Sequence, residues 1–216
     1  MDRHAILLTA CLKIAEGCSN RCAYCVISSI RSNARSRPPG DIVAEAEDLV
    51  CRGIKEIILV AQNTTAYGRD LTGRPPLARL LEDLCMIDGL RWIRILYAYP
   101  HRIDERFLSV MAEHPKICRY LDILIQHIDD GILRAMLRKG GSRAVRRAIR
   151  AAREAMPDIA LRTSLIVGFP GETKAAFDAL LDFVRDTRFD HLGVFTYSPE
   201  EGTKAALLPS RIGQKE

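Results

Sequence analysis

Three cysteines near the start of the chain have the spacing of a metal-binding loop. Cys18, Cys22 and Cys25 are separated by three and then two residues, directly after the apolar segment 12–15. One short loop with this spacing can fold three thiolates around a single centre, and thiolates select zinc, copper(I) or iron–sulfur clusters. Structural zinc sites and iron–sulfur clusters usually take four protein ligands, so three cysteines leave one position open for a substrate or cofactor. The alternative is three free cysteines without a metal.

The segments around this loop predict the elements that hold it. Short β-rich segments alternate with amphipathic helical segments about six times, which indicates a parallel sheet with helices packed outside. Strands are expected at residues 12–15, 56–61, 92–96, 120–125, 160–167 and 191–195, and helices at residues 41–52, 77–86, 105–113, 131–137, 143–156 and 173–185. Gly53 is the expected end of the first helix, and Ser142 is the expected N-cap of the helix at 143–156. Six βα units are fewer than the eight of a closed barrel. The predicted fold class is therefore α/β, a partial (βα)6 parallel barrel.

Polar residues follow every expected strand. They occupy residues 16–18, 62–65, 97–101, 126–127, 168–172 and 197–203. The carboxyl ends of barrel strands carry the chemistry of such folds, so these groups are expected to converge on one rim as a cofactor pocket requires. Taken singly, each segment is explained as a turn or a helix cap, and His101 and His127 as structural histidines. Gly168 and Gly171 free the backbone of one turn, and Glu172 is expected in the first turn of the next helix.

Length and composition indicate an ordinary globular protein. The 216 residues are expected to form a single domain, with the barrel at about residues 10–206 and a loose tail at 207–216. No run of about 18 apolar residues occurs, so no membrane span is expected, and no signal-peptide cleavage site follows the short apolar segment 5–11. Seven cysteines are an odd number for a disulfide framework and suit the reducing cytoplasm. Cys51 and Cys85 fall in expected helices and are predicted to be core residues.

Basic residues are concentrated in two places. Between residues 131 and 153 there are eight basic residues and no acidic one, namely Arg134, Arg138, Lys139, Arg143, Arg146, Arg147, Arg150 and Arg153. Such a run can face nucleic acid or a ribosome, or it can be a solvated helix face. A smaller group, Arg31, Arg35 and Arg37, follows the cysteine loop. It can contact an anionic group of a cofactor or substrate, or position the loop by surface ion pairs.

The cysteine spacing, with the aromatic Tyr24 before the last cysteine, resembles the cluster loop of radical S-adenosylmethionine (SAM) enzymes. The resemblance implies one 4Fe-4S cluster whose open iron is chelated by the amino and carboxylate groups of SAM. It also implies an external electron donor, because reductive cleavage of SAM gives the 5′-deoxyadenosyl radical.

Further segments resemble the methylthiotransferases within that superfamily. Residues 12–18, 35–38, 161–164 and 168–173 match the general pattern, and residues 64–68, 96–100 and 197–203 are similar to the RimO branch. That branch methylthiolates an aspartyl residue of the small-subunit ribosomal protein numbered twelve. The resemblance implies that Cys18, Cys22 and Cys25 ligate the cluster and that Tyr24 packs beside it. It also implies that the SAM pocket is lined by Gln62, Gln126, Arg162 and Gly168.

The chain departs from the RimO pattern at several positions. Asn63 replaces the usual Asp, as in the tRNA-modifying, MiaB-like branch, while Ser32 and Leu137 replace expected glycines and Leu124 an expected proline. The family's N-terminal domain, which holds the sulfur-donating cluster, and its C-terminal TRAM domain are not expected within these residues. The sequence therefore predicts a RimO-like radical SAM core acting on a ribosomal protein. The alternatives are a tRNA methylthiotransferase core, or a non-catalytic remnant that docks to the ribosome or RNA.

Overall fold

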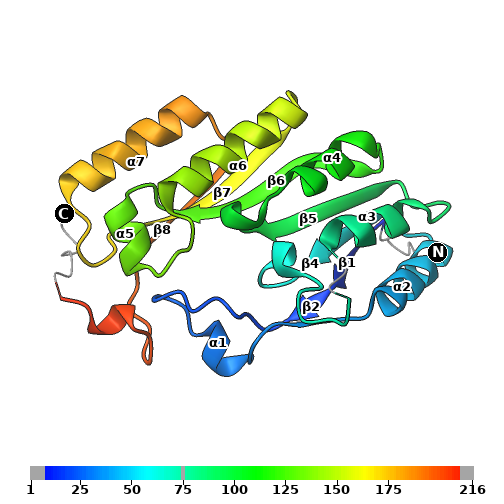
Figure 1. Cartoon of the computed structure of the whole chain (residues 1–216), viewed down its shortest axis with the longest axis horizontal. Coiled ribbons are helices and arrows are strands. Elements are labelled where there is room, and N and C mark those ends of the chain that lie inside the picture. Colours follow the sequence, from blue (N-terminus) through cyan, green and yellow to red (C-terminus); the bar gives the residue numbers. More distant parts are fainter. Residues whose placement is uncertain (1–7, 74–75, 210–216) are drawn as a thin grey trace, which may run out of the picture.

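The centre of the fold is a six-stranded parallel sheet. The computed structural model describes residues 8–73 and 76–209, and its sheet has the strand order β1-β4-β5-β6-β7-β8 (Figure 1). The strands are β1 (Thr9–Lys13), β4 (Glu56–Val60), β5 (Trp92–Ala98), β6 (Ile117–Gln126), β7 (Ala160–Val167) and β8 (His191–Thr196). Every neighbouring pair is parallel, so all the carboxyl ends share one edge. Because β1 and β8 remain the two ends of this strand order, the predicted partial (βα)6 barrel is confirmed.

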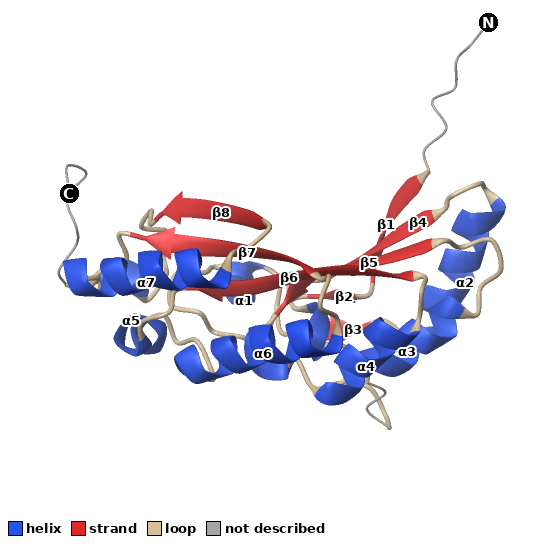
Figure 2. Ribbon diagram, turned by 90° about the horizontal axis from the view of Figure 1, so that it is seen from above, coloured by secondary structure: helices blue, strands red, loops and turns tan. Residues whose placement is uncertain are grey.

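Helices connect the strands and pack on one face of the sheet. They are α2 (Pro39–Cys51), α3 (Leu77–Cys85), α4 (Glu105–Glu113), α5 (Asp130–Ala135), α6 (Gly141–Ala155) and α7 (Lys174–Thr187). Figure 2 shows α2, α3, α4, α6 and α7 on the same side of the sheet. Shorter pieces are α1 (Ile27–Ile30), the 3-10 turns η1 (Thr64–Ala66), η2 (Pro100–Arg102) and η3 (Ala205–Leu207), and an antiparallel pair, β2 (Ala15–Glu16) with β3 (Arg35–Ser36). Among the described residues no helix is both long enough and apolar enough to cross a membrane.

The two faces of the sheet differ in chemistry because strand side chains alternate between them. Residues on the helix-covered face, such as Ile57, Ile93 and Leu121, are fully buried in one continuous hydrophobic core. The other face carries ion pairs. Arg94 Nε lies 2.7 Å from Glu56 Oε1 on neighbouring strands. The concave face of the barrel therefore carries charged side chains.

The first predicted strand was wrong in its bounds. It starts at Thr9 and ends at Lys13, and residues 15–16 belong to β2 instead. Ala15 pairs with Ser36, and Glu16 pairs with Arg35, as the chain returns from the cysteine loop. Residues 12–13 and residue 15 are all in strands, but β1 belongs to the six-stranded sheet and β2 to the two-stranded one.

Two helix starts also differ from the prediction. The N-cap of α6 is Gly140, in a left-handed conformation with φ 89°, and not Ser142. Ser142 lies inside the helix, where its amide and its hydroxyl donate to Asp130 at 2.7 and 2.9 Å. Glu172 precedes α7 rather than lying in its first turn, because Thr173 is the N-cap and accepts from the amide of Ala176.

Some burial predictions were confirmed and others were wrong. Cys85 is buried in the core as predicted. Cys51 was also predicted to be a core residue, but it is the last residue of α2 and is exposed to solvent. Most of the basic run is an exposed helix face, yet Arg138 is only 9% exposed. Arg138 lies in the turn after α5, and its side chain reaches the backbone of β6 at Leu124. The predicted tail at 207–216 is described only to residue 209, and Ala205 just before it is fully buried.

Candidate metal centre and cofactor pocket

The cysteine loop lies between β2 and α1, and close backbone packing shapes its start. Gly17 has φ +77°, and a Cβ at this position would lie 2.4 Å from the carbonyl oxygen of Asn33. The next residue, Cys18, donates its amide to the carbonyl oxygen of Ser32 at 3.1 Å. Since only glycine combines a positive φ with this close approach, the residue before the first cysteine is fixed by the path of the returning chain.

The middle of the loop is attached to the carboxy-terminal half of the barrel. The amide of Ala23 donates to the carbonyl oxygen of Met136 at 3.0 Å, and its own carbonyl accepts from the amide of Ala205 at 2.8 Å. Ala23 is buried with Met136, Phe169 and Ala205 in a second, smaller apolar cluster. Figure 1 shows the blue cysteine loop reaching toward α5. The loop is thereby held from residues more than a hundred positions away in the sequence.

The three thiols are largely shielded from solvent, and a charge on Cys22 affects both of the others. Cys18 and Cys22 are buried, Cys25 is half-buried, and all three are free. Burial raises the pKa of Cys18 and of Cys25, and the charge of a thiolate at Cys22 raises both further. Within the described residues, no three Cys, His, Asp or Glu side chains already stand in an ion-binding arrangement. Backbone amides of Asn20 and Ile27 oppose the effect of burial by hydrogen bonding to Cys18 and Cys25, which favours the thiolate form that a metal requires.

Cationic groups surround the cysteine loop. The guanidinium of Arg138 stacks on Tyr99 with Cζ 4.2 Å from the ring centroid, and the Tyr99 hydroxyl lies 3.7 Å from Cys22 Sγ. Arg102 is close enough to Cys18 for a thiolate there to raise its pKa, although burial lowers that pKa on balance. Burial, followed by the charges of Arg102 and Arg138, lowers the pKa of His101 to about 4. The loop therefore lies in a positive field, which suits an anionic thiolate cluster.

Several buried polar atoms on this rim have no nitrogen or oxygen partner among the described residues. They are Gln62 Oε1, His101 Nε2, Arg102 Nε and Arg138 Nη1. Unpartnered buried groups are rare in proteins and are explained by an absent ligand, ion or water. Together with the all-sulfur donor set, they fit an iron–sulfur cluster with a polar cofactor beside it.

A pocket of about 320 Å³ opens next to the cysteine loop at the carboxyl ends of β5 to β8. Its lining is aromatic and apolar with a few polar groups, namely Tyr24, Tyr97, Leu124, Gln126, Ser164, Ile166, Phe195, Thr196, Tyr197 and Ser198. This mixture is typical of cofactor sites. Tyr24 and Gln126, both predicted as cofactor-binding residues, are brought together here.

The other three predicted cofactor residues lie outside the lining of this pocket. Gln62 is at the end of β4 with its buried Oε1 unpartnered. Arg162 lies deeper in the barrel, where its Nη1 donates to Asp122 Oδ1 at 2.7 Å. Gly168, with φ +73°, has no atom within 4 Å of the position of a Cβ, so its backbone borders open space. None of these positions is tested by a bound ligand, and their roles stay predictions.

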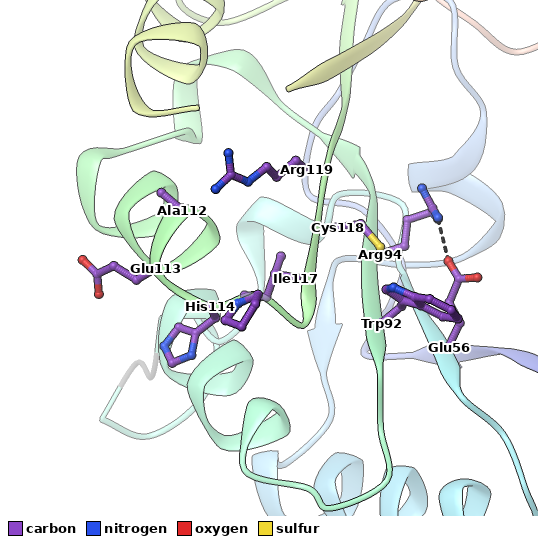
Figure 3. Close-up of a pocket in the computed structure, with 10 residues that line it drawn as sticks. Glu56, Trp92, Arg94, Ala112, Glu113, His114, Ile117, Cys118 and Arg119 are labelled. Carbon is purple, nitrogen blue, oxygen red and sulfur yellow. Dashed lines mark hydrogen bonds and ion pairs between the residues drawn. The ribbon is translucent and has the colours of Figure 1, made fainter. Parts of the chain in front are cut away.

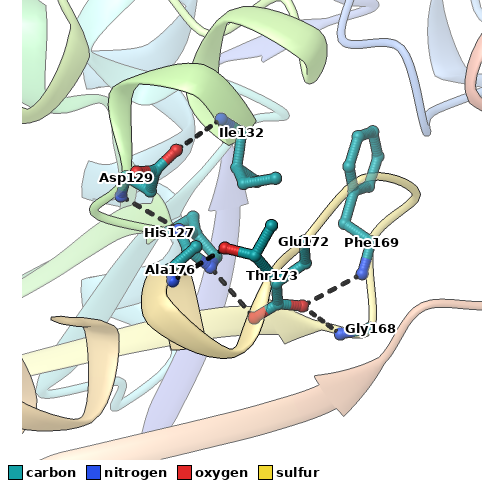
Figure 4. Close-up of polar contacts among 8 residues, drawn as sticks. All are labelled: His127, Asp129, Ile132, Gly168, Phe169, Glu172, Thr173 and Ala176. Carbon is teal, nitrogen blue, oxygen red and sulfur yellow. Dashed lines mark hydrogen bonds and ion pairs between the residues drawn. The ribbon is translucent and has the colours of Figure 1, made fainter. Parts of the chain in front are cut away.

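A buried polar network fixes the turn that follows β7 (Figure 4). One carboxylate oxygen of Glu172 accepts from the amides of Gly168 and Phe169, the latter at 3.2 Å. The other lies 3.2 Å from His127 Nε2, and His127 Nδ1 accepts from the amide of Asp129 at 3.0 Å. The prediction that His127 is a satisfied structural histidine is confirmed, whereas His101 keeps an unpartnered ring nitrogen.

Asn63, the residue that separates the two family branches, is buried on the same rim. Its Oδ1 accepts from the hydroxyl of Thr65 at 2.9 Å, and Thr65 Oγ1 accepts from the amide of Tyr99 at 3.0 Å. An amide oxygen and a carboxylate oxygen both accept such a bond. The departure from Asp to Asn therefore preserves the link between β4 and the Tyr99 segment.

A larger cavity, of about 840 Å³, lies at the opposite end of the barrel (Figure 3). It is lined by the amino-terminal ends of strands, including Glu56, Trp92, Arg94 and Cys118, and by His114 after α4. Figure 3 shows the Arg94–Glu56 pair at its wall. Since none of the predicted site residues lies there and barrel chemistry occurs at the carboxyl ends, we do not assign the site to this cavity.

Sequence reasoning missed several residues that the fold brings to the site. Ser164 and Phe195 line the pocket, and Arg138 lies behind the cysteine loop, whereas Tyr97 belongs to the segment 97–101 that was expected on this rim. Ser164 and Phe195 are at alternate positions of their strands on the concave face, so strand periodicity was an available signal. Arg138 had no such signal, because the basic residues around it in the sequence are exposed.

The chain was compared with known proteins. A profile of the Radical SAM superfamily matches residues 12–184. The ribosomal protein uS12 methylthiotransferase RimO of Syntrophus aciditrophicus is 60% identical over 96% of this chain and 46% of its own length. The protein of the same name from Geobacter sulfurreducens is 54% identical over 96% of this chain and 46% of its own length. The chain thus spans about half the length of the curated relatives it matches.

Solved structures share the fold at low sequence identity. The radical S-adenosylmethionine methyltransferase TsrM from Kitasatospora setae has a TM-score of 0.70 at 20% identity, covering 87% of this chain and 36% of that protein. Coproporphyrinogen III oxidase (HemN) from Escherichia coli has a TM-score of 0.64 at 17% identity, covering 91% and 46%. The match to the superfamily profile covers most of the chain, from β1 into α7, and the chain therefore belongs to the Radical SAM superfamily.

Proposed function

We propose that this chain is the radical-generating core of a RimO-type methylthiotransferase that acts on ribosomal protein uS12. The observation that carries the proposal is 60% identity over 96% of the chain to a protein of that name. In this proposal Cys18, Cys22 and Cys25 hold one 4Fe-4S cluster and leave one iron for SAM. When bound, the cluster and SAM supply a carbon-centred radical that removes a hydrogen atom from a substrate C–H bond.

The protein's part is to place three thiolates and shield them from water. Gly17 turns the chain so that Cys18 enters the rim, and the Ala23 hydrogen bonds hold the loop against α5 and η3. Burial raises the pKa of Cys18 and Cys25, and the amides directed at them partly offset that rise by hydrogen bonding to the thiolate form. Two of the three cysteines are buried, which limits their oxidation before the cluster is assembled.

The pocket beside Tyr24 is the proposed site for SAM. Tyr24, Tyr97 and Phe195 offer aromatic faces for the adenine ring, and Gln126 and Ser164 offer hydrogen bonds. Glu172 holds the amides of Gly168 and Phe169, so that the end of β7 keeps a fixed backbone beside the open space at Gly168. We assign supporting roles to Gln62, whose buried Oε1 has no hydrogen-bond partner among the described residues, and to Arg162, held by Asp122.

The proposal also covers the domain organisation of the chain and its cellular compartment. We treat residues 1–216 as a single radical SAM core domain, supported by one continuous main core. The other four cysteines, Cys11, Cys51, Cys85 and Cys118, have no assigned metal-binding role in this proposal. All seven cysteines are free, which supports the reducing cytoplasm as the compartment.

Anaerobic reconstitution tests the cofactor part of the proposal. We expect about four irons and four sulfides per chain, and formation of 5′-deoxyadenosine from SAM once a one-electron reductant is added. Cys22→Ala should lose the iron, while the matched control Cys118→Ala, a half-buried cysteine at the other end of the barrel, should keep it. Stoichiometric zinc without iron contradicts the proposal.

Isotope transfer tests the substrate. With uS12 whose aspartyl residues are deuterated at Cβ, we expect deuterium in the 5′-deoxyadenosine, because the abstracted atom stays with the nucleoside. This readout needs hydrogen abstraction only and is independent of the sulfur source. Deuterium-free product in the presence of uS12, together with modified nucleosides after incubation with tRNA, favours the MiaB-like alternative instead.

A second partner class, RNA, is favoured by the surface of α6. Arg143, Arg147 and Arg150 are exposed along one side of this helix, and no ion pair to them occurs in the described part of the chain. Other exposed arginines, such as Arg52 and Arg79, pair with a carboxylate four residues away. An arginine stripe without acidic partners suits the phosphate backbone of ribosomal RNA, or of tRNA.

Salt dependence separates RNA docking from a merely solvated face. Replacing Arg143, Arg147 and Arg150 by glutamine should reduce RNA affinity and flatten the slope of log Kd against log salt by about two units. The matched control replaces the paired arginines Arg52, Arg79 and Arg119 by glutamine, which removes the same charge elsewhere. Equal slopes in the two variants contradict an RNA-binding role for α6.

A further inference from the structure

Arg138 is a buried cation without a carboxylate partner. Its side chain is 9% exposed, its Nη2 donates to the carbonyl oxygen of Leu124 on β6, and no ion pair to it occurs among the described residues. Burying a guanidinium in such a place is costly unless a negative group compensates it. The positive charge of Arg138 is therefore buried without a carboxylate among the described residues to compensate it.

The groups around Arg138 lead to the cysteine loop. The guanidinium lies over the ring of Tyr99, and the Tyr99 hydroxyl contacts Cys22 Sγ at 3.7 Å. Tyr24 and Cys22 are also close enough to interact electrostatically with the guanidinium of Arg138. Burial raises the pKa of both tyrosines above their ordinary range, so at neutral pH they carry no charge.

Backbone contacts hold this arrangement in place. The amide of Arg138 donates to Leu133, and the preceding Met136 carbonyl accepts from the amide of Ala23 in the cysteine loop. The terminal nitrogen Nη1 is buried and has no nitrogen or oxygen partner. The residues that follow α5 therefore both hold the cysteine loop, through Met136, and place the cation of Arg138 near Cys22.

We propose that Arg138 is a positioning residue that sets the reduction potential of the cluster held by Cys22. The inference rests on the proposed function, because it requires a cluster at the three cysteines. When bound, the cluster would accept one electron from a low-potential donor such as dithionite, with no proton or group transferred, and Arg138 would keep its positive charge beside the added negative charge. A fixed cation in a poorly hydrated site favours the more negative state, so Arg138 makes reduction easier.

Charge and shape are separated by three variants. Arg138→Met removes the charge and the hydrogen bond to Leu124, Arg138→Gln removes the charge but retains a donor, and Arg138→Lys retains the charge. Arg94→Met is the matched control, because Arg94 also stacks on a tyrosine, Tyr120 at 5.0 Å, but lies at the far end of the barrel. Circular dichroism and thermal unfolding of the apo variants report whether each one folds.

The readout is the reduced fraction of the reconstituted cluster, followed by electron paramagnetic resonance at a series of poised potentials. We expect at least a tenfold smaller ratio of reduced to oxidised cluster for the Met and Gln variants, equivalent to a shift of about 59 mV to more negative potential. The Lys variant and Arg94→Met should stay within twofold of the unmodified chain. Equal potentials for the unmodified chain and both neutral variants overturn the inference.

Loss of iron is also decisive. If the Met and Gln variants fold but bind no iron while the Lys variant does, the positive charge holds the cluster in place rather than setting its potential, and the inference as stated fails. If the Lys variant also loses iron, Arg138 acts as a structural clamp and the inference fails. The titration does not need uS12. The expected shifts in potential, found together with no deuterium transfer from uS12, therefore contradict the proposed substrate and leave the inference standing.

Discussion

The imidazole of His127 and the carboxylate of Glu172 meet inside the protein, with Nε2 and Oε1 3.2 Å apart. Because His127 Nδ1 accepts the amide of Asp129, the ring proton is placed on Nε2 and is donated to the carboxylate. The same carboxylate holds the turn at Gly168. The pair therefore joins the carboxyl ends of β6 and β7, which border the proposed SAM pocket.

Glu172→Ala should destabilise the fold and weaken SAM binding. The change leaves the amides of Gly168 and Phe169 and the Nε2 of His127 without their acceptor, and each unsatisfied buried group costs about 1–3 kcal/mol. Partial relaxation and water entry limit the total to about 3 kcal/mol. Urea unfolding measures the loss, with the exposed Glu201→Ala as the control. A change below about 1 kcal/mol contradicts the proposed network.

Gly17→Ala should abolish cluster binding while the barrel still folds. The added Cβ would meet the carbonyl oxygens of Asn33, Arg31 and Ser32 at 2.4, 2.8 and 2.8 Å, so the cysteine loop must shift. Gly202→Ala is the matched control, because Gly202 has nearly the same φ of +78° but no atom within 4 Å of its Cβ position. Iron analysis after reconstitution, beside circular dichroism of the apo proteins, distinguishes the two. Similar iron content in both variants contradicts a steric role for Gly17.

Leu137→Gly should stabilise the protein. Leu137 adopts φ 56° and is 44% exposed, so its side chain gains little from burial while its backbone lies in the left-handed region. Relief of about 1–2 kcal/mol of strain is partly offset by the greater freedom of glycine in the unfolded chain, which leaves a gain of up to about 1 kcal/mol. Leu137→Ala, which removes the side chain but keeps the strain, should show no gain in urea unfolding. Equal effects of the two substitutions contradict a backbone origin.

His101 should make the apo protein less stable below neutral pH. Burial and nearby cations lower the folded-state pKa of His101 from the ordinary 6.5 to about 4, so between these values the unfolded chain binds more protons. Its contribution to stability is therefore present above pH 6.5 and is lost as the pH falls toward 4. Allowing for partial exposure, the loss is about 1–2 kcal/mol. Urea unfolding at pH 7.5 and pH 4.5 should show a smaller pH effect for His101→Gln; identical pH profiles contradict this assignment.

Strand and helix periodicity predicted the fold because each element has one apolar face and the chain alternates them. The strands at β4 and β7 and the helix α4 were located within a residue or two, since their apolar residues are buried at the expected spacing. The junctions were harder to predict. Ser142 has the side chain of an N-cap, but Asp130 from the preceding helix captures it, and Gly140 takes the cap position.

The candidate site likewise has one part that local sequence signals predict and one part that they do not. The spacing of Cys18, Cys22 and Cys25 is a local signal, so the candidate metal loop could be read from the sequence. The surroundings of the loop depend on contacts across the barrel, such as Arg138 over Tyr99, and no local pattern encodes them. The glycines expected at Ser32 and Leu137 are explained by the structure, because both residues have positive φ. These two positions retain a backbone conformation for which their side chains are poorly suited.

The two hydrogen bonds of Ala23 have a mechanical consequence. Its amide is tied to Met136, and its carbonyl is tied to Ala205, which begins the last described turn of the chain. A force applied to the polypeptide beyond Leu208 would act on the cysteine loop through the hydrogen bond between Ala205 and Ala23, without passing through the rest of the barrel. The cysteine loop is thus hydrogen-bonded to the carboxyl-terminal segment, so strain applied at that end is transmitted to Cys22 and Cys25, the proposed metal ligands on either side of Ala23.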